Sequence, residues 1–183
     1  MDLKQRLGAV LFSLIASAAS GQTMDTNAVL ASIDQKAAAY RDMAMKIWSL
    51  AEVGYQEQQS SALLQAQLKA AGFNLVAGVA EIPTAFTATW GSGKPVIGII
   101  GEFDALPGLS QAAEPNRRAL TPEGPGHGCG HHLFGTASTA AAIAVKDWLV
   151  ANQRSGTLRF YGTPAEEGGA GKVYMLRAGL FDD

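Results

Sequence analysis

All three histidines and the single cysteine of this chain lie in one short, glycine-rich stretch, Gly126–His132. Imidazole and thiolate groups hold transition metals in proteins. Cys129 and His131 are separated by one glycine, so in an extended or loop conformation their side chains project to the same side. Glycines on both sides of Cys129 let the backbone bend closely around an ion. The stretch therefore predicts a metal site with Cys129 and His131 as ligands, and with His127 and the last histidine as weaker candidates.

Two acidic motifs flank this stretch in the sequence. Glu102 and Asp104 belong to a Gly-Glu-Phe-Asp sequence upstream, and Glu166 and Glu167 follow a Pro-Ala dipeptide downstream. Adjacent glutamates at a strand end point in different directions, so one can bind a metal while the other stays free to act as a general base. Singly, such features are usually solvated surface, turns or core. Together, and without the paired Cys-x-x-Cys units of structural zinc sites, they favour an open catalytic site.

The elements that would position these residues are two strands. Val96–Ile100 is a continuous apolar run that leads into Glu102, and such a run is typical of a central strand buried on both faces. Thr157–Tyr161 is a second strand and leads into the glutamate pair. A helix over residues 133–151 separates them, and its first half is nearly all small residues, so we expect it to lie close to the sheet. The order predicts an α/β fold, a three-layer α/β/α sandwich with a mostly parallel sheet, whose site forms at the carboxyl ends of the strands.

The remaining patterns fit a single core, which is what a chain of 183 residues can bury. Apolar positions recur at helical spacing from about residue 25 to 50 and again over 57–71. Residues 73–79 and 84–90 alternate as half-buried strands, and residues 168–177 begin a further helix. Residues 106–128 form a long loop, rich in proline and glycine, that leads into the Cys/His stretch. A loop of this length in a compact domain favours a functional role.

Composition and the N-terminal segment limit the possible partners and the cellular location of this chain. The chain is 48% hydrophobic and 16% charged with a formal net charge of −2, which is ordinary globular composition, and it has no Lys/Arg run. We therefore expect no nucleic-acid partner. Residues 1–21 have the basic start, short apolar core and small-residue end of a signal peptide, which predicts a periplasmic or secreted protein without a membrane partner. Translation from Met24 is the alternative and predicts a cytoplasmic protein.

An exported protein with one cysteine has no internal disulfide. Cys129 is then free, paired with another chain or bound to metal. Its setting among glycines and histidines favours metal, because a cation stabilises the thiolate.

Three segments carry a resemblance to a known family. Residues 101–107 (GEFDALP), 126–132 (GHGCGHH) and 163–170 (TPAEEGGA) resemble the metal-dependent aminoacylase/carboxypeptidase-type amidohydrolases. Among these they look most like the aminobenzoyl-glutamate hydrolase branch. The likeness runs from about Ile47 to the C-terminus.

This resemblance implies a site with two divalent metal ions, zinc or manganese, that hydrolyses the amide bond of a small N-acyl amino acid of the aminobenzoyl type. It implies Glu166 as general base and Asp104 as the residue that orients a ligand. The metal ligands would be Cys129, His131 and Glu167. His127, His132 and Glu102 would contact substrate or support the ligands. His132 departs from the family pattern, which has Asp or Asn there.

Members of this family are much longer and act as dimers, homo- or heterodimeric. They supply further histidine ligands downstream and carry an inserted dimerisation domain. We therefore expect residues 25–183 to be the N-terminal part of such a catalytic domain, with little or no amidase activity alone.

Two other hypotheses stay open at this point. One is a hydrolase with Cys129 as nucleophile and a histidine as base, although His131 is too near in sequence to orient easily against it. The other is a non-catalytic metal-binding domain that assembles with a second chain.

Overall fold

The computed structural model describes residues 26–182, so the expected signal peptide lies outside the described residues. The helices are α1 (Thr26–Asp34), α2 (Ala37–Leu50), α3 (Gln58–Ala70), α4 (His131–Ala151) and α5 (Gly171–Arg177), with one short 3-10 helix, η1 (Val79–Glu81). The strands are β1 (Asn74–Ala77), β2 (Phe86–Ser92), β3 (Val96–Gly101) and β4 (Gly156–Gly162). Each expected element is present, but the first expected helix is broken by a turn between α1 and α2.

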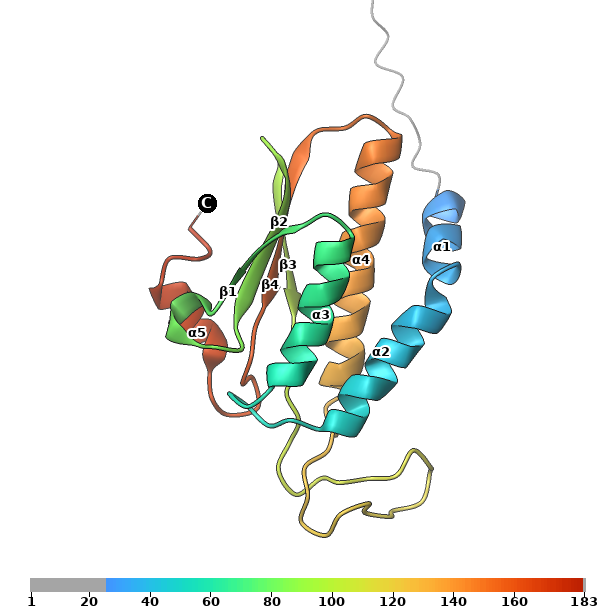
Figure 1. Ribbon diagram of the computed structural model, residues 1–183, viewed down its shortest axis with the longest axis vertical. Coiled ribbons are helices and arrows are strands. Elements are labelled where there is room, and N and C mark those ends of the chain that lie inside the picture. Colours follow the sequence, from blue (N-terminus) through green and yellow to red (C-terminus); the bar gives the residue numbers. More distant parts are fainter. Residues whose placement is uncertain (1–25, 183) are drawn as a thin grey trace, which may run out of the picture.

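The sheet lies between two layers of helices (Figure 1), with α3 and α4 against one face and α5 on the other, while α2 packs on α3 and α4. The strand order is β1-β2-β4-β3. The α/β/α sandwich is therefore confirmed. The expectation of a mostly parallel sheet is wrong for the described strands, because β1–β2 and β2–β4 are antiparallel and only β3–β4 is parallel. The crossover through α4 makes β4 parallel to β3. Strand β4 lies between β2 and β3, however, and it pairs with β2 in the antiparallel direction.

Strand β3 lies at the edge of this four-stranded sheet, next to β4 alone. Val96, Ile97 and Ile100 are 39%, 44% and 37% exposed. The prediction of a central strand buried on both faces is therefore wrong among the residues described. An apolar run indicates that a strand can be buried, but the neighbouring strands and helices that would bury it come from other parts of the sequence.

The main core fills the space between the sheet and α2–α4. Phe86 stacks on Phe160 and on Phe103, with ring centroids 5.7 and 6.3 Å apart, and the helices add the wholly buried Ile47 and Leu64. Helix α4 packs on β3 and β4, as expected, and also on α2 and α3. The small residues buried in its first half are Gly135, Thr136, Thr139, Ala140 and Ala142.

The carboxyl ends of β3 and β4, the start of α4 and the α2–α3 turn all meet at one end of the molecule, the lower end in Figure 1. This is the end where the sequence places its acidic and Cys/His motifs. Within residues 26–182, no helix has the length and apolar character needed to cross a membrane.

Gly162, the last residue of β4, tests how tightly this core is packed. A Cβ at this position would lie 2.1 Å from the ring of the buried Phe86. We expect Gly162→Ala to lower the free energy of unfolding by about 1–3 kcal/mol, because the ring must shift in a filled core. Urea unfolding measures the change. Gly98→Ala on the exposed edge strand is the control, since its nearest neighbour, the Tyr161 ring, is 3.3 Å away. Equal unfolding midpoints for the two variants would contradict the packing described.

Candidate metal centre

Parallel pairing of β3 and β4 brings the two acidic motifs together. Gly101 and Gly162 are register partners at the ends of these strands, so Glu102 and Glu166 lie on neighbouring chain segments. The long loop closes at its base through reciprocal backbone hydrogen bonds between Leu106 and Gly126 of 3.0 and 2.9 Å. These bonds bring the start of the Cys/His stretch next to the chain segment that follows Asp104.

Gly130 makes the link between the two expected ligands. Its φ of +93° is in the left-handed region, which glycine adopts without steric cost, and it forms the N-cap of α4. Cys129 lies in the loop and is exposed, whereas His131 is the first helical residue and is buried. The turn at Gly130, rather than an extended stretch, brings the two side chains to one place.

Asp104 fixes the orientation of the His131 ring. Its Oδ1 accepts a hydrogen bond from Nδ1 of His131 at 2.9 Å, and its Oδ2 accepts one from the backbone N–H of Glu167, also at 2.9 Å. Burial would raise the pKa of Asp104, but these hydrogen bonds outweigh it and lower the pKa. Because the N–H of Nδ1 is used in the hydrogen bond to Asp104, Nε2 is the ring nitrogen whose lone pair can bind a cation.

Three further carboxylates surround the same ring. Glu102 Oε2 is 3.0 Å and Glu166 Oε2 is 3.8 Å from Nε2, and Glu167 Oε1 is 3.8 Å from Nδ1. Lys172 pairs with Glu102 from the start of α5. Burial would lower the pKa of His131, but the hydrogen bond and charge of Asp104, with Glu102 and Glu167, raise it. The centre holds more negative than positive charge, and this excess favours a bound cation.

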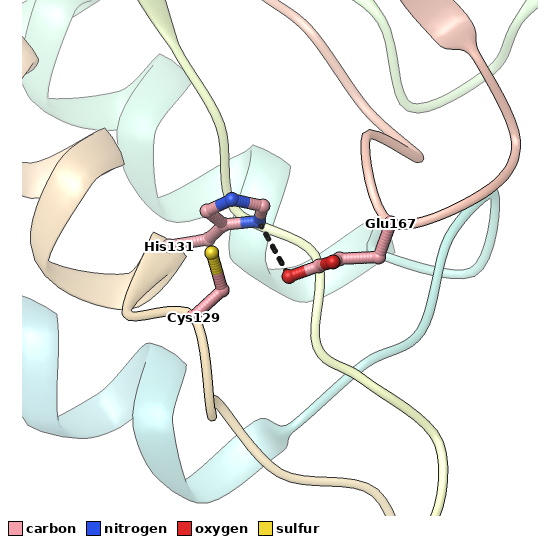
Figure 2. A group of neighbouring side chains, drawn as sticks. All are labelled: Cys129, His131 and Glu167. Atoms are coloured by element: carbon pink, nitrogen blue, oxygen red, sulfur yellow. Dashed lines mark ion pairs between the residues drawn. The ribbon is translucent and has the colours of Figure 1, made fainter.

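Two overlapping groups have the donor types and spacing to hold a metal. Cys129, His131 and Glu167 form one, shown in Figure 2, and Glu102, His131 and Glu166 form the other. Within each group the donor atoms lie within 4.8 Å of one another. Thiolate, imidazole and carboxylate together suit zinc, and three protein ligands leave a position open. The residues present therefore fit one metal well, and the second group shares His131 with the first.

The thiol of Cys129 is held in its protonated form by these surroundings. The negative charge of Glu167 and, to a smaller extent, of Glu166 and Glu102 raises the pKa of Cys129. A cysteine nucleophile needs the opposite shift. A cation between Cys129 and Glu167 would remove this repulsion and stabilise the thiolate.

His127 and His132 belong to neither ligand group. They pack with Trp48 of α2, and the ring centroid of His132 lies 5.0 Å from those of both Trp48 and His127. Nε2 of His127 donates to the carbonyl of Ile47 at 3.1 Å. Burial lowers the pKa of His127, and burial with the charges of the other two histidines lowers the pKa of His132 to about 4. Both rings therefore pack as neutral groups at neutral pH.

Two parts of this centre, the α2–α3 turn and Lys172, carry no chemical motif in the sequence. The turn lines a cavity of about 210 Å³ beside Asp104 and Glu167. The sequence pattern places Glu57 only at the start of one helix and Lys172 only at the start of another. The one usable signal is Gly54, which breaks the helical pattern and so marks a turn.

An α/β/α fold with a cluster of metal-ligating side chains at its strand ends agrees with what comparison with known proteins shows. Residues 98–183 match the sequence profile of Peptidase family M20/M25/M40. The chain is 52% identical over 147 residues to a subunit of the p-aminobenzoyl-glutamate hydrolase of Escherichia coli, covering 79% of this chain and 30% of that protein. It is 31% identical to human Xaa-Arg dipeptidase, covering 81% of this chain and 34% of that protein.

A solved structure supports the same grouping. The YXEP protein of Bacillus subtilis, described as a dinuclear metal binding peptidase from the M20 family, aligns with a TM-score of 0.60 and 25% identity, over 86% of this chain and 41% of that one. Residues 98–183 thus match part of a peptidase M20 domain, and the resemblance found in the motifs of the chain is confirmed. It spans about a third of the length of the curated relatives named above.

The buried His132 makes stability depend on pH. Its pKa is about 4 in the folded chain and near 6.5 in the unfolded one, so its contribution to stability is complete above pH 6.5 and is lost as the pH falls toward 4. At about 1.4 kcal/mol per pKa unit, the loss is up to about 3 kcal/mol. Urea unfolding of metal-free protein at pH 7 and pH 4.5 measures it.

The matched variant is His132→Gln, which removes the titrating group and should lose correspondingly less stability between the two pH values. Only this difference matters, because Gln also packs less well against Trp48. Parallel pH dependences for wild type and variant would show that His132 is not held neutral.

Proposed function

We propose that this chain carries part of a metal-dependent amidohydrolase site that cleaves the amide bond of an N-acyl amino acid. The observation that carries the proposal is the convergence of Cys129, His131 and Glu167 beside a second, more exposed glutamate, Glu166. A bound divalent cation would polarise the amide carbonyl as a Lewis acid. Zinc or manganese, with two ions in the complete site, is the proposed cofactor.

The chain's own residues divide the remaining work. The Glu166 side chain is 42% exposed, against 16% for Glu167. Glu166 is therefore the proposed general base, which takes a proton from the attacking water and delivers it to the departing amine. Glu167 is the proposed ligand, and Asp104 holds the His131 ring and the Glu167 backbone in place.

The substrate and the assembly are proposed from the names of the relatives. The relative in E. coli is named as a hydrolase of p-aminobenzoyl-glutamate and as one subunit of that enzyme. We propose a small aminobenzoyl-type N-acyl amino acid as substrate, and a homo- or heterodimer as the working assembly. Since three protein ligands hold two metals weakly, the 183-residue chain alone is expected to turn over little or no substrate.

Metal chemistry is favoured over a cysteine nucleophile by the charge around Cys129. The carboxylates that raise the pKa of this thiol would keep it protonated and unreactive at neutral pH. The same carboxylates are what a cation needs.

Two single substitutions distinguish the proposed metal ligand, Glu167, from the proposed general base, Glu166. Cobalt is added to the metal-free chain, and its affinity is measured from the thiolate–cobalt absorption band. Glu167→Gln should weaken binding at least about tenfold because it removes a ligand, whereas Glu166→Gln should bind within about threefold of wild type. Equal affinities for wild type and Glu167→Gln would contradict the ligand assignment.

The same variants are assayed for p-aminobenzoate release from p-aminobenzoyl-glutamate with zinc or manganese. Any turnover should disappear in Glu166→Gln while metal binding persists. Turnover that survives Glu166→Gln would contradict the base assignment.

A further inference from the structure

The α2–α3 turn connects both acidic motifs. The carbonyl of Glu52 accepts a hydrogen bond from the N–H of Ala105 at 2.8 Å, next to Asp104. Val53 also pairs with Ala105 as a parallel bridge. On the other side of the turn, the hydroxyl of Tyr55 donates to the carbonyl of Gly169, just beyond the glutamate pair. This short segment therefore contacts the chain after β3 and the chain after β4.

Glu57 ends the turn, and its carboxyl group is wholly buried. Its Oε1 accepts a hydrogen bond from the backbone N–H of Ala165 at 2.8 Å. Ala165 is itself wholly buried and immediately precedes Glu166. Its φ is +56°, in the left-handed region that costs an alanine roughly 1–2 kcal/mol. Such a conformation persists only where the surroundings hold it.

A helix-capping role does not account for Glu57. It occupies the N-cap position of α3, yet its side chain makes no capping hydrogen bond. Glu52 caps this helix instead, accepting from the N–H groups of Gln59 and Ser60 at 3.1 and 2.8 Å. The Glu57 carboxyl thus offers Oε1 to the N–H of Ala165 and makes no capping hydrogen bond to its helix.

We infer that Glu57 is a positioning residue for the Glu166–Glu167 pair. By holding the N–H of Ala165, it fixes the left-handed turn at the end of β4 and so sets the directions in which the two following carboxylates leave the backbone. The inference rests on the proposed function for the roles of those carboxylates. This role requires only that the side chain at position 57 offers an oxygen that accepts the hydrogen bond from the N–H of Ala165. Burial raises the pKa of Glu57, but protonated and ionised carboxyl groups both provide that oxygen.

The first test reads the backbone without any metal. Amide hydrogen exchange of Ala165 and of Glu167, whose N–H is bound by Asp104, is measured in the metal-free chain. In Glu57→Leu, which keeps the bulk but lacks the acceptor, both amides should exchange at least about tenfold faster. In Glu57→Gln, which keeps the oxygen, they should stay within about threefold of wild type. Glu52→Leu is the control, since it removes the helix cap but touches neither amide.

The second test reads the ligand. Cobalt affinity should fall at least about tenfold in Glu57→Leu and remain near wild type in Glu57→Gln and Glu52→Leu. Unchanged exchange at Glu167 in Glu57→Leu, or unchanged cobalt affinity in that variant, would overturn the inference. If Glu57→Leu does not fold, a folded Glu57→Gln with tenfold faster exchange at Ala165 overturns it equally. A wild-type chain that binds no cobalt defeats the proposed function instead, and the exchange test still decides the role of Glu57.

Discussion

The hydrogen bond between the Asp104 carboxylate and Nδ1 of His131 is the interaction on which the candidate centre depends. It leaves Nε2 as the nitrogen with a free lone pair, and the other oxygen of the same carboxylate holds the backbone of Glu167. One buried acidic group thus connects the end of β3, the start of α4 and the end of β4. Because the Asp104 side chain is fully enclosed, its two hydrogen bonds link the orientation of two candidate ligands from distant parts of the chain.

This arrangement also creates an electrostatic problem. Four carboxylates converge on one imidazole, and Lys172 offsets only part of their charge. Burial opposes the shift at His131, but the carboxylates raise its pKa, and the charge of Glu167 raises the pKa of Cys129. A metal ion would therefore compete with protons for these two donors. The repulsion among these carboxylates favours the binding of a divalent ion.

Much of this could be predicted from residue types and spacing, because ligand chemistry is local. The Gly-Cys-Gly-His stretch and the Glu-Glu pair indicated the candidate donors, and the strand-helix-strand order predicted that they meet at one sheet edge. The direction and exposure of the strands could not be read in the same way. An apolar run such as Val96–Ile100 looks alike in a central strand and at an edge, and nothing local shows that β4 inserts between β2 and β3. Glu57 was hidden for a similar reason, since its partner Ala165 is distant in sequence and contributes only a backbone N–H.

The family match and the geometry both point to a metal ion beside Cys129. The match covers residues 98–183 and hence every donor in the two candidate groups, while the surrounding charge gives a physical reason for a cation beside this thiol. Zinc-edge X-ray absorption of the zinc-loaded chain tests this most directly. We expect one sulfur ligand at about 2.3 Å with nitrogen and oxygen ligands at about 2.0–2.2 Å, and loss of the sulfur shell in Cys129→Ser. A shell of nitrogen and oxygen alone in the wild-type chain would contradict the metal centre described.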